Sequence, residues 1–301
     1  MSVESKKIVF DSGLNEKPVL VVGIVKDIEK TLKRDIKKIG MALSFFKDIH
    51  WFLVESDSSD KSQQTLLEMK DINMNFDFIS IKIPVNSYNF RTERLAMARN
   101  IYLAHIRDHI DSIEFPYIVI ADFNLLNNKL SMESVVSSWS RTDWDVVTAN
   151  QSSRYYDIWA LRHPLWSPND CWEQHEFLKK YVKTPEIVNS YSLRSRMIKI
   201  PKDSEWIVVD SAFGGFAIYR SSFLLNDVNY EGKNDAGNMV CEHVPFNQKI
   251  KELGARIFIN TNLINAHYTD HSRRMTILFT FLRILRYFNL NKIHRNILKN
   301  P

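Results

Sequence analysis

The feature that most constrains the fold is the alternation of short apolar runs with amphipathic segments. Residues 19–25 (Val-Leu-Val-Val-Gly-Ile-Val) form a continuous apolar run, typical of a parallel strand buried on both faces. Helical periodicity follows over residues 28–46 and again over about 92–109. Further strands are predicted at residues 50–54, 78–83 and 117–121. Strands that alternate with helices predict an α/β fold with a mixed, mostly parallel sheet flanked by helices.

The second half of the chain has a less regular pattern. Strands are expected at residues 145–149, 157–161 and 256–260. Between them, a Trp- and Pro-rich loop through Trp172 continues into a polar stretch up to Lys202. Because loops on a rigid scaffold usually carry specificity, an acceptor site is expected in this region. The predicted organisation is one catalytic domain over residues 1–270 and a helical tail over 271–301.

Composition excludes several classes of protein. Hydrophobic residues make up 45% of the 301 positions, which excludes a disordered or fibrous chain. The two cysteines, Cys171 and Cys241, lie far apart, so a disulfide scaffold is not expected and a reducing compartment is the simplest interpretation. The net charge of +5 comes from the end of the chain, where seven Lys and Arg and no acid lie between residues 273 and 299. This distribution argues against a nucleic-acid groove across the body.

The tail has the pattern of an amphipathic helix. One side would carry the apolar residues Ile277, Phe281, Ile284, Leu285 and Phe288, with Arg283 and Arg286 nearly opposite. Such a helix fits an anionic membrane surface, and an ordinary packing or dimerisation helix is the alternative. The longest charge-free stretch, residues 275–282, is too short to span a bilayer, and no apolar signal segment opens the chain. The expected location is cytoplasmic, peripheral at the inner face of a membrane.

Three polar clusters follow predicted parallel strands, at residues 25–27, 55–57 and 122–124. Ligands of open α/β sheets bind beyond the carboxyl ends of the strands, so these clusters are expected on one rim.

Four motifs in order carry a resemblance to a known family. The first strand comes first, then Arg91-Thr-Glu-Arg-Leu-Ala-Met-Ala-Arg-Asn100, then Asp122-Phe-Asn124 at a strand end. The fourth motif pairs Phe213-Gly-Gly-Phe216 with Cys241-Glu-His243, which opens a helix that ends in Leu-Gly. Over about residues 18–270 the chain resembles GT-A glycosyltransferases, in part the large family 2 group and the fungal capsule-associated mannosyltransferases.

The resemblance implies a donor site for a UDP- or GDP-sugar. Its residues would be Val25, Glu55, Asp57, Arg91, Arg94, Arg99, Asp122 and Phe123. Guanidinium groups suit a diphosphate because each can bind two of its oxygens. The Asp-X-Asp position would hold Mn²⁺ or Mg²⁺ through Asp122, Asn124 and a C-terminal histidine, His267 or secondarily His271. Asn124 replaces the family's second Asp and brings no charge. For each of these residues an ordinary structural role is the alternative.

The resemblance also implies a catalytic and an acceptor site. Glu242 and His243 occupy the position of the family's Glu-Asp motif, where a carboxylate removes the acceptor's proton, and the substitution leaves open which residue is the base. Whether the anomeric configuration is inverted or retained also stays open. Trp159 and Trp172, together with Gly214 and Gly215, are expected at the acceptor, although the tryptophans could equally be core residues.

The sequence therefore predicts a metal-dependent glycosyltransferase acting on a saccharide or lipid-linked saccharide, in surface polysaccharide or glycan synthesis. A sugar-phosphate nucleotidyltransferase is one alternative, but the glycine-rich phosphate loop it would need after the first strand is missing. The other alternative is a catalytically inactive, membrane-associated binding protein with the same fold.

Overall fold

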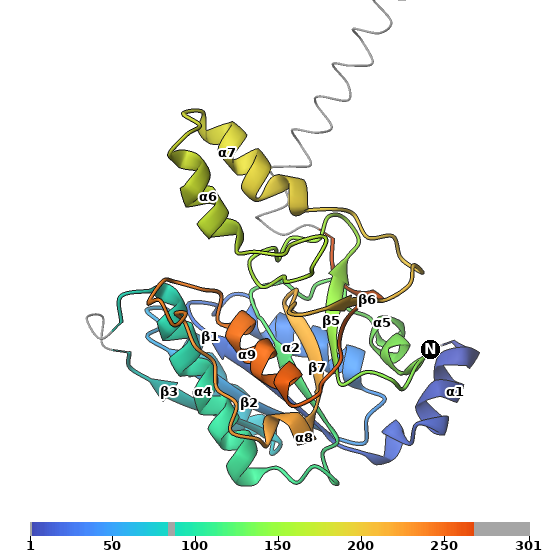
Figure 1. Ribbon diagram of the computed structural model, residues 1–301. Coiled ribbons are helices and arrows are strands. Elements are labelled where there is room, and N and C mark those ends of the chain that lie inside the picture. Colours follow the sequence, from blue (N-terminus) through green and yellow to red (C-terminus); the bar gives the residue numbers. More distant parts are fainter. Residues whose placement is uncertain (1, 84–87, 268–301) are drawn as a thin grey trace, which may run out of the picture.

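The computed structural model describes residues 2–83 and 88–267, which form an α/β fold around an eight-stranded sheet in the order β3-β2-β1-β4-β7-β5-β8-β6 (Figure 1). The strands are β1 (Val19–Val25), β2 (Ile49–Ser56), β3 (Phe76–Ile81), β4 (Tyr117–Ala121), β5 (Val146–Gln151), β6 (Ile207–Val209), β7 (Phe216–Arg220) and β8 (Ile257–Ala266). Strands β3, β2, β1 and β4 pair in parallel, as do β5 and β8, whereas β7 and β6 run antiparallel to their neighbours. The predicted fold class is confirmed.

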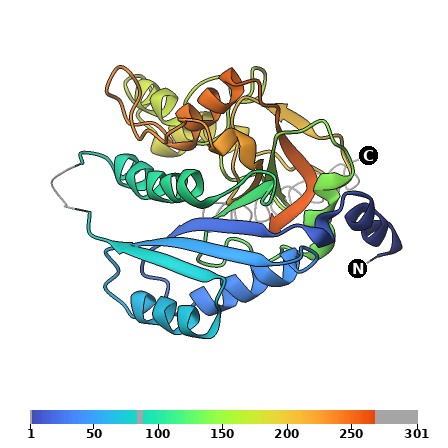
Figure 2. The ribbon, with the colours of Figure 1, turned by 90° about the horizontal axis from the view of Figure 1, so that it is seen from below.

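Helices cover both faces of the sheet. The helices of the described residues are α1 (Val3–Asp11), α2 (Leu32–Leu43), α3 (Ser62–Ile72), α4 (Arg91–His109), α5 (Met132–Val136), α6 (Cys171–Lys179), α7 (Pro185–Ser192), α8 (Ser221–Leu224) and α9 (His243–Glu252). Short 3₁₀ turns lie at Leu14–Glu16, Ser137–Trp139 and Arg194–Arg196. Helices α4 and α9 pack on one face, and α2 and α3 on the other (Figure 2).

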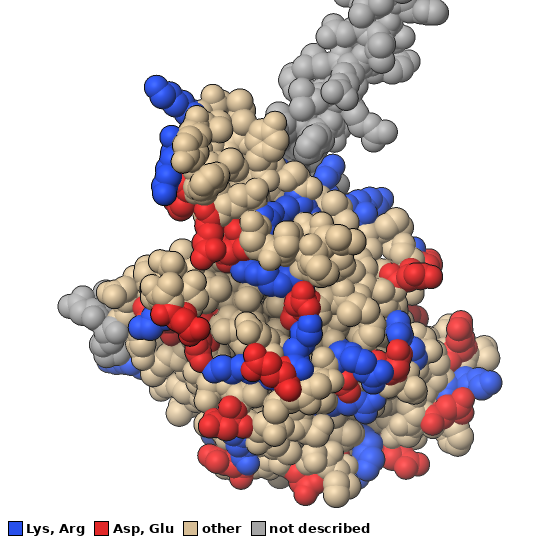
Figure 3. Space-filling view, in the orientation of Figure 1, with Lys and Arg blue, Asp and Glu red and all other residues tan. Residues whose placement is uncertain are grey.

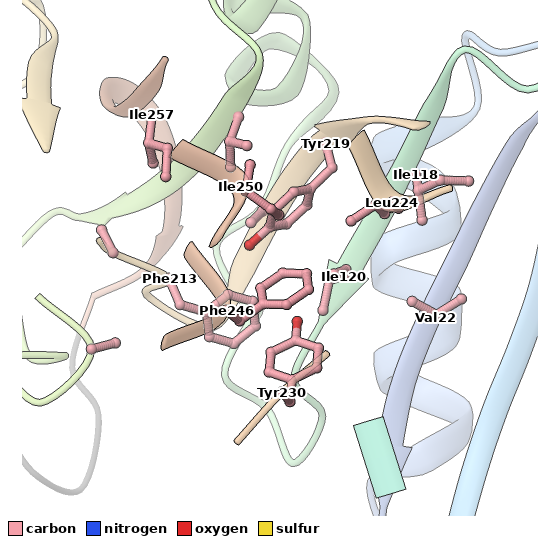
Figure 4. Close-up of a cluster of buried hydrophobic side chains, with 14 of the residues drawn as sticks. Val22, Ile118, Ile120, Phe213, Tyr219, Leu224, Tyr230, Phe246, Ile250 and Ile257 are labelled. Carbon is pink, nitrogen blue, oxygen red and sulfur yellow. The ribbon is translucent and has the colours of Figure 1, made fainter. Parts of the chain in front are cut away.

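Strand β1 shows why the sheet is buried on both sides. Successive side chains of a strand point to opposite faces, so an apolar run supplies two cores at once. Leu20 and Val22 belong to the core on the α4 and α9 side, whereas Val19 and Val21 belong to the core under α2. Figure 4 shows the first of these cores, where rings from α9 and from the loop before it cover β4 and β7.

Two sequence expectations about local structure are wrong. Residues 157–161 form a turn and not a strand, and the expected loop up to Lys202 contains the helices α6 and α7. The turn is held by tertiary contacts: the Asp157 carboxylate accepts a hydrogen bond from the Gly214 amide at 2.9 Å. The two helices project together from the body as a hairpin (Figure 1). The predicted tail helix lies outside the described residues.

None of the helices within residues 2–83 and 88–267 has the length and apolar character needed to cross a membrane.

Candidate functional site

A cavity of about 580 Å³ opens at the carboxyl ends of β1, β2 and β4, between these strand ends and helices α4 and α9. Its walls bring together eleven of the residues singled out from the sequence: Val25, Asp57, Arg91, Arg94, Arg99, Asp122, Phe123, Asn124, Trp159, Glu242 and His243. The strand ends meet because β1 pairs in parallel with both β2 and β4. The position expected for a ligand of an open α/β sheet is therefore the position of the cavity.

The turns at the rim of the cavity have a left-handed backbone conformation that few residues other than glycine adopt. Asp27, Asp57 and Asn124 follow β1, β2 and β4, and each has a positive φ, of 50°, 51° and 68°. Asp and Asn tolerate this left-handed region better than other residues with a side chain at Cβ. After β4, Leu125 is also left-handed, and the buried Asp35 carboxylate of α2 accepts the amides of both Asn124 and Leu125. Strained backbone held by tertiary contacts is characteristic of functional sites.

Arg99 links three elements beneath the cavity. From α4, its Nε lies 3.1 Å from Oε1 of Glu242 and its Nη2 lies 3.2 Å from Oδ1 of Asp122. Its Nη1 donates to the Tyr102 hydroxyl. Burial opposes the charge of Arg99, but Tyr102 and the two carboxylates outweigh it and hold its pKa above the ordinary range. The sequence predicted a phosphate ligand here, whereas the structure shows a buried guanidinium bound to two protein carboxylates.

Glu242 and His243 open helix α9, and both are buried, with only 3% of each residue exposed. The His243 ring stacks on Phe213 at 4.0 Å between centroids. Burial, and then the charge of Arg99, lower the pKa of His243 well below its ordinary value, so the ring is neutral at pH 7. Within the described residues neither ring nitrogen has a hydrogen-bond partner. A neutral imidazole with buried, unpartnered nitrogens therefore forms part of the cavity wall, beside a carboxylate that is ion-paired with Arg99.

Asp157 is a cavity residue that the sequence interpretation missed. It lay inside an expected strand, so nothing marked it as a ligand-facing carboxylate. Burial raises its pKa to about 6, the Gly214 amide opposes that rise, and the charges of Asp122 and Glu242 add to it. Within the described residues Asp157 forms no ion pair. Its signal in the sequence was weak, because a single Asp between aromatic residues fits many local structures.

Three cations line the cavity mouth and form no ion pair within the described part of the chain. They are Arg91 and Arg94 at the start of α4 and Lys26 after β1. Arg91 and Lys26 are exposed, and Arg94 is half-buried. Their charges are free to bind an anionic ligand, in contrast to that of Arg99.

Gly214 and Gly215 do not line the cavity, but they position two residues that do. The Gly215 carbonyl accepts the Asp122 amide at 2.9 Å, and the Gly214 amide donates to Asp157. Their φ values are +71° and +85°, and a Cβ on Gly214 would lie 2.7 Å from the Ala149 carbonyl oxygen. Glycine is therefore required here for internal packing, which is a different reason from the sugar approach expected from the sequence.

Three other predicted residues lie outside the cavity wall. Glu55 is buried and its Oε1 accepts the Ser58 amide at 2.8 Å, so it shapes the turn after β2. Trp172 lies behind Trp159, which does line the cavity, and 6.4 Å separate the two ring centroids. His267 follows β8, where its Nδ1 lies 2.6 Å from the Ser152 hydroxyl. The structure therefore does not bring His267 into the cavity wall with Asp122 and Asn124.

The metal site predicted from the sequence is only partly assembled by the protein. In residues 2–83 and 88–267, no three His, Cys, Asp or Glu side chains gather closely enough to hold an ion. Asp122 uses Oδ1 for Arg99, while 27% of its side chain is exposed and its other oxygen accepts no hydrogen bond from the described residues. Asn124 beside it is exposed. One or two such ligands suffice for a metal that arrives with phosphate oxygens and keeps several waters.

Comparison with solved structures returns glycosyltransferases. A mannosyltransferase from Pyrobaculum calidifontis, solved with GDP-Man and Mn²⁺, is 11% identical with a TM-score of 0.45. The match covers 83% of this chain and 56% of the mannosyltransferase chain. Staphylococcus aureus TarS 1-349 with UDP-GlcNAc is 12% identical with a TM-score of 0.42, covering 85% and 60%. GalNAc-T7 with UDP, GalNAc and Mn²⁺ is 12% identical with a TM-score of 0.42, covering 83% and 44%.

This chain thus spans less than two thirds of each of these solved chains. No protein-family model and no curated protein matches the sequence. With TM-scores below 0.5 the likeness carries no functional argument, and a function has to be derived from the cavity.

Proposed function

We propose that this chain is a glycosyltransferase that moves a sugar from a nucleotide diphosphate sugar to a saccharide or lipid-linked saccharide in glycan synthesis. The observation that carries the proposal is the cavity at the strand ends. Arg91, Arg94 and Lys26, which form no ion pair within the described residues, line it together with the carboxylates Asp122 and Asp157. Cations without protein partners suit a diphosphate, and carboxylates beside them suit a metal ion and a sugar hydroxyl.

The donor would lie along the rim. Asp57 and Val25, at the ends of β2 and β1, are placed to contact the nucleoside, with Phe123 as an apolar wall. Arg91 and Arg94 are placed to bind the diphosphate oxygens. Arg99 takes a different role from the one expected: it fixes Asp122 and Glu242 in position through its own hydrogen bonds.

Asp122, supported by the Asn124 amide, would hold the Mn²⁺ or Mg²⁺ ion. Such an ion, when bound, neutralises charge on the departing nucleotide. Asp122 is suited to this because two contacts hold it in place: its backbone amide donates to the Gly215 carbonyl, and its Oδ1 accepts from Arg99. Its Oδ2 is then the oxygen that would bind the ion. His267 does not line the cavity and contacts Ser152 instead, so it is not counted among the metal ligands.

The acceptor would enter from the side of Trp159, whose Nε1 donates to Asp170 at 3.2 Å and whose ring lines the cavity. The acceptor hydroxyl oxygen bonds to the anomeric carbon as the bond from that carbon to the diphosphate breaks. Of the carboxylates, Asp157 is the best candidate to take the hydroxyl proton, because it forms no ion pair within the described residues, whereas Glu242 is paired with Arg99. Glu242 and His243 then orient the acceptor from α9.

The test is calorimetric binding of UDP and GDP, each with and without Mn²⁺, to wild type, Asp122→Asn and Arg94→Ala. Asp227→Asn, a change of the same kind at a side chain that is 93% exposed, is the matched control. We expect one nucleotide to bind in a metal-dependent way, with at least roughly tenfold loss in both cavity variants and none in the control.

The absence of binding by the folded wild type to either nucleotide would refute the donor site. Binding without any cleavage of the corresponding nucleotide sugars would instead favour the inactive binding protein with the same fold.

A further inference from the structure

The hairpin of α6 and α7 projects from the body (Figure 1). His175 on α6 and Asn189 on α7 are linked by a contact of 3.1 Å between Nε2 and Oδ1. At its base the buried Arg196 donates to the Ser167 hydroxyl and to the Asn169 carbonyl. Val188 and Ser192 on α7 are buried as well. The side chains that point outward are therefore presented by a fixed scaffold.

Positive charge lies at the tip of this projection. Residues 179–183 (Lys-Lys-Tyr-Val-Lys), which connect α6 to the loop before α7, hold three lysines and no acid, whereas residues 171–192 as a whole hold three Lys and three Glu. Within the described residues, Lys179 pairs with Glu176 at 3.0 Å, whereas Lys180, Lys183 and Lys199 are exposed and form no ion pair. Lys and Arg side chains stand out on the projecting part of the surface in Figure 3.

Large apolar side chains are exposed among these cations. They are Leu165, Phe177, Tyr181, Ile187, Tyr191 and Ile198. Tyr181 is 73% exposed, and its ring contacts that of Phe177 at 5.2 Å between centroids. Tyrosine and phenylalanine rings beside lysines are the composition of surfaces that insert into the headgroup layer of a bilayer.

The described part of the chain ends at the base of the same projection. His267, the last described residue, contacts Ser152, and the adjacent Arg154 donates to the Met197 carbonyl at 2.7 Å, just after α7. The sequence from residue 268 onward carries the second cluster of positive charge.

We infer that the α6–α7 hairpin, with residues 193–199, is a docking surface for an anionic membrane, independent of the tail. Lysines 180, 183 and 199 meet the anionic headgroups, and the exposed rings and isoleucines enter the boundary with the acyl chains. A nucleic acid would satisfy the lysines, but it offers no comparable environment for Ile187 and Ile198. Because Trp172 at the foot of α6 contacts Trp159 in the cavity wall, docking would bring the cavity close to a lipid-linked acceptor.

The experiment is sedimentation of the full chain with vesicles of phosphatidylcholine alone and with about 30% phosphatidylserine. The variants are Lys180→Glu with Lys183→Glu, and Tyr181→Ser with Tyr191→Ser. The matched control is Lys6→Glu with Lys7→Glu on α1, which changes the same charge at two exposed positions away from the hairpin. Thermal melting of each variant checks that it is folded.

We expect wild type and control to bind the anionic vesicles, and both hairpin variants to bind at least roughly tenfold more weakly with the tail intact. Equal binding to neutral vesicles, or wild-type binding by both hairpin variants, overturns the inference. So does a hairpin-dependent dimer or a hairpin-dependent complex with single-stranded RNA when vesicle binding is unchanged.

Insertion is measured separately with Tyr181→Trp, whose fluorescence brominated lipids should quench. Phe10→Trp on α1, another exposed aromatic position at 77%, should not be quenched. Equal quenching at the two positions would show that the hairpin is not the docking surface. Neither measurement needs a nucleotide sugar, so a failure here is distinguishable from a failure of the proposed activity.

Discussion

Arg99 and Glu242 lie 143 positions apart in the sequence, yet Nε of the one stands 3.1 Å from Oε1 of the other in a buried ion pair. The same guanidinium reaches Asp122 at the end of β4. Helix α4, helix α9 and the centre of the sheet are therefore held together by one side chain, directly beneath the cavity. Its removal would leave two carboxylates without their cation.

Replacement of Arg99 by Met should destabilise the chain strongly. Loss of one partner from a buried charge pair costs about 3–5 kcal/mol, because the remaining charge stays in a poorly solvating environment. Arg91→Met is the matched control on the same helix, and its cost should stay within about 0.5 kcal/mol because Arg91 is exposed. Urea unfolding measures both. A similar free energy of unfolding for the two variants would show that the buried network is not important for stability.

Asp157→Asn should stabilise the folded state at neutral pH. The folded-state pKa of about 6 lies above the ordinary value of 3.8, so the folded chain binds this proton more tightly than the unfolded chain. The contribution of Asp157 to the free energy of unfolding is therefore greatest below pH 3.8 and falls as the pH rises through about 6. Asn removes the cost of burying the Asp157 charge but weakens the hydrogen bond from the Gly214 amide. The net gain in the free energy of unfolding at pH 7 is about 1–2 kcal/mol.

Urea unfolding at pH 7 and near pH 4 tests this dependence, with Asp227→Asn as a surface control. The gain in free energy of unfolding should disappear at the lower pH. A destabilised variant at pH 7 would mean that the Asp157 carboxylate is satisfied in the fold.

Asp157→Asn should also separate binding from turnover, if the proposed activity is correct. Loss of a general base lowers turnover by about 10²–10⁴-fold, whereas the dissociation constant of the nucleotide should not change. Release of nucleotide from its sugar donor measures the first, and calorimetry the second. If the variant retained wild-type turnover, Asp157 would not be the proton acceptor, and Glu242 or His243 would be assigned that role instead.

Gly214→Ala should cost more than Gly237→Ala, although the two glycines have similar φ values of +71° and +77°. The left-handed backbone costs about 1–2 kcal/mol for any residue with a Cβ. At Gly237 nothing lies within 4 Å of the added carbon, while at Gly214 the Ala149 carbonyl oxygen lies at 2.7 Å. The difference in the free energy of unfolding isolates the effect of close packing, and equal costs would contradict it.

The sequence by itself determined the parallel half of the sheet and the place of the cavity, but not the antiparallel strands β6 and β7. Strand β1 was predicted with its observed limits, residues 19–25, because a continuous apolar run followed by an amphipathic segment is typical of a strand buried on both faces. Helix α4 and strand β4 were equally clear, and parallel pairing places the polar residues that follow β1, β2 and β4 on one rim. These are local patterns combined with one topological rule, so a single sequence suffices for them.

Only the tertiary structure decided what the individual side chains do. Arg99 and Arg94 look alike on the sequence of α4, and both line the cavity. Arg99, however, is buried between carboxylates from distant elements, whereas Arg94 forms no ion pair within the described residues. Asp157 became a site residue because a turn, and not a strand, was fixed by the Gly214 amide. The α6–α7 hairpin was expected as a loop, whereas its two helices contact each other, for example through His175 and Asn189. Each of these outcomes depends on partners far away in the chain, whose proximity no local pattern encodes.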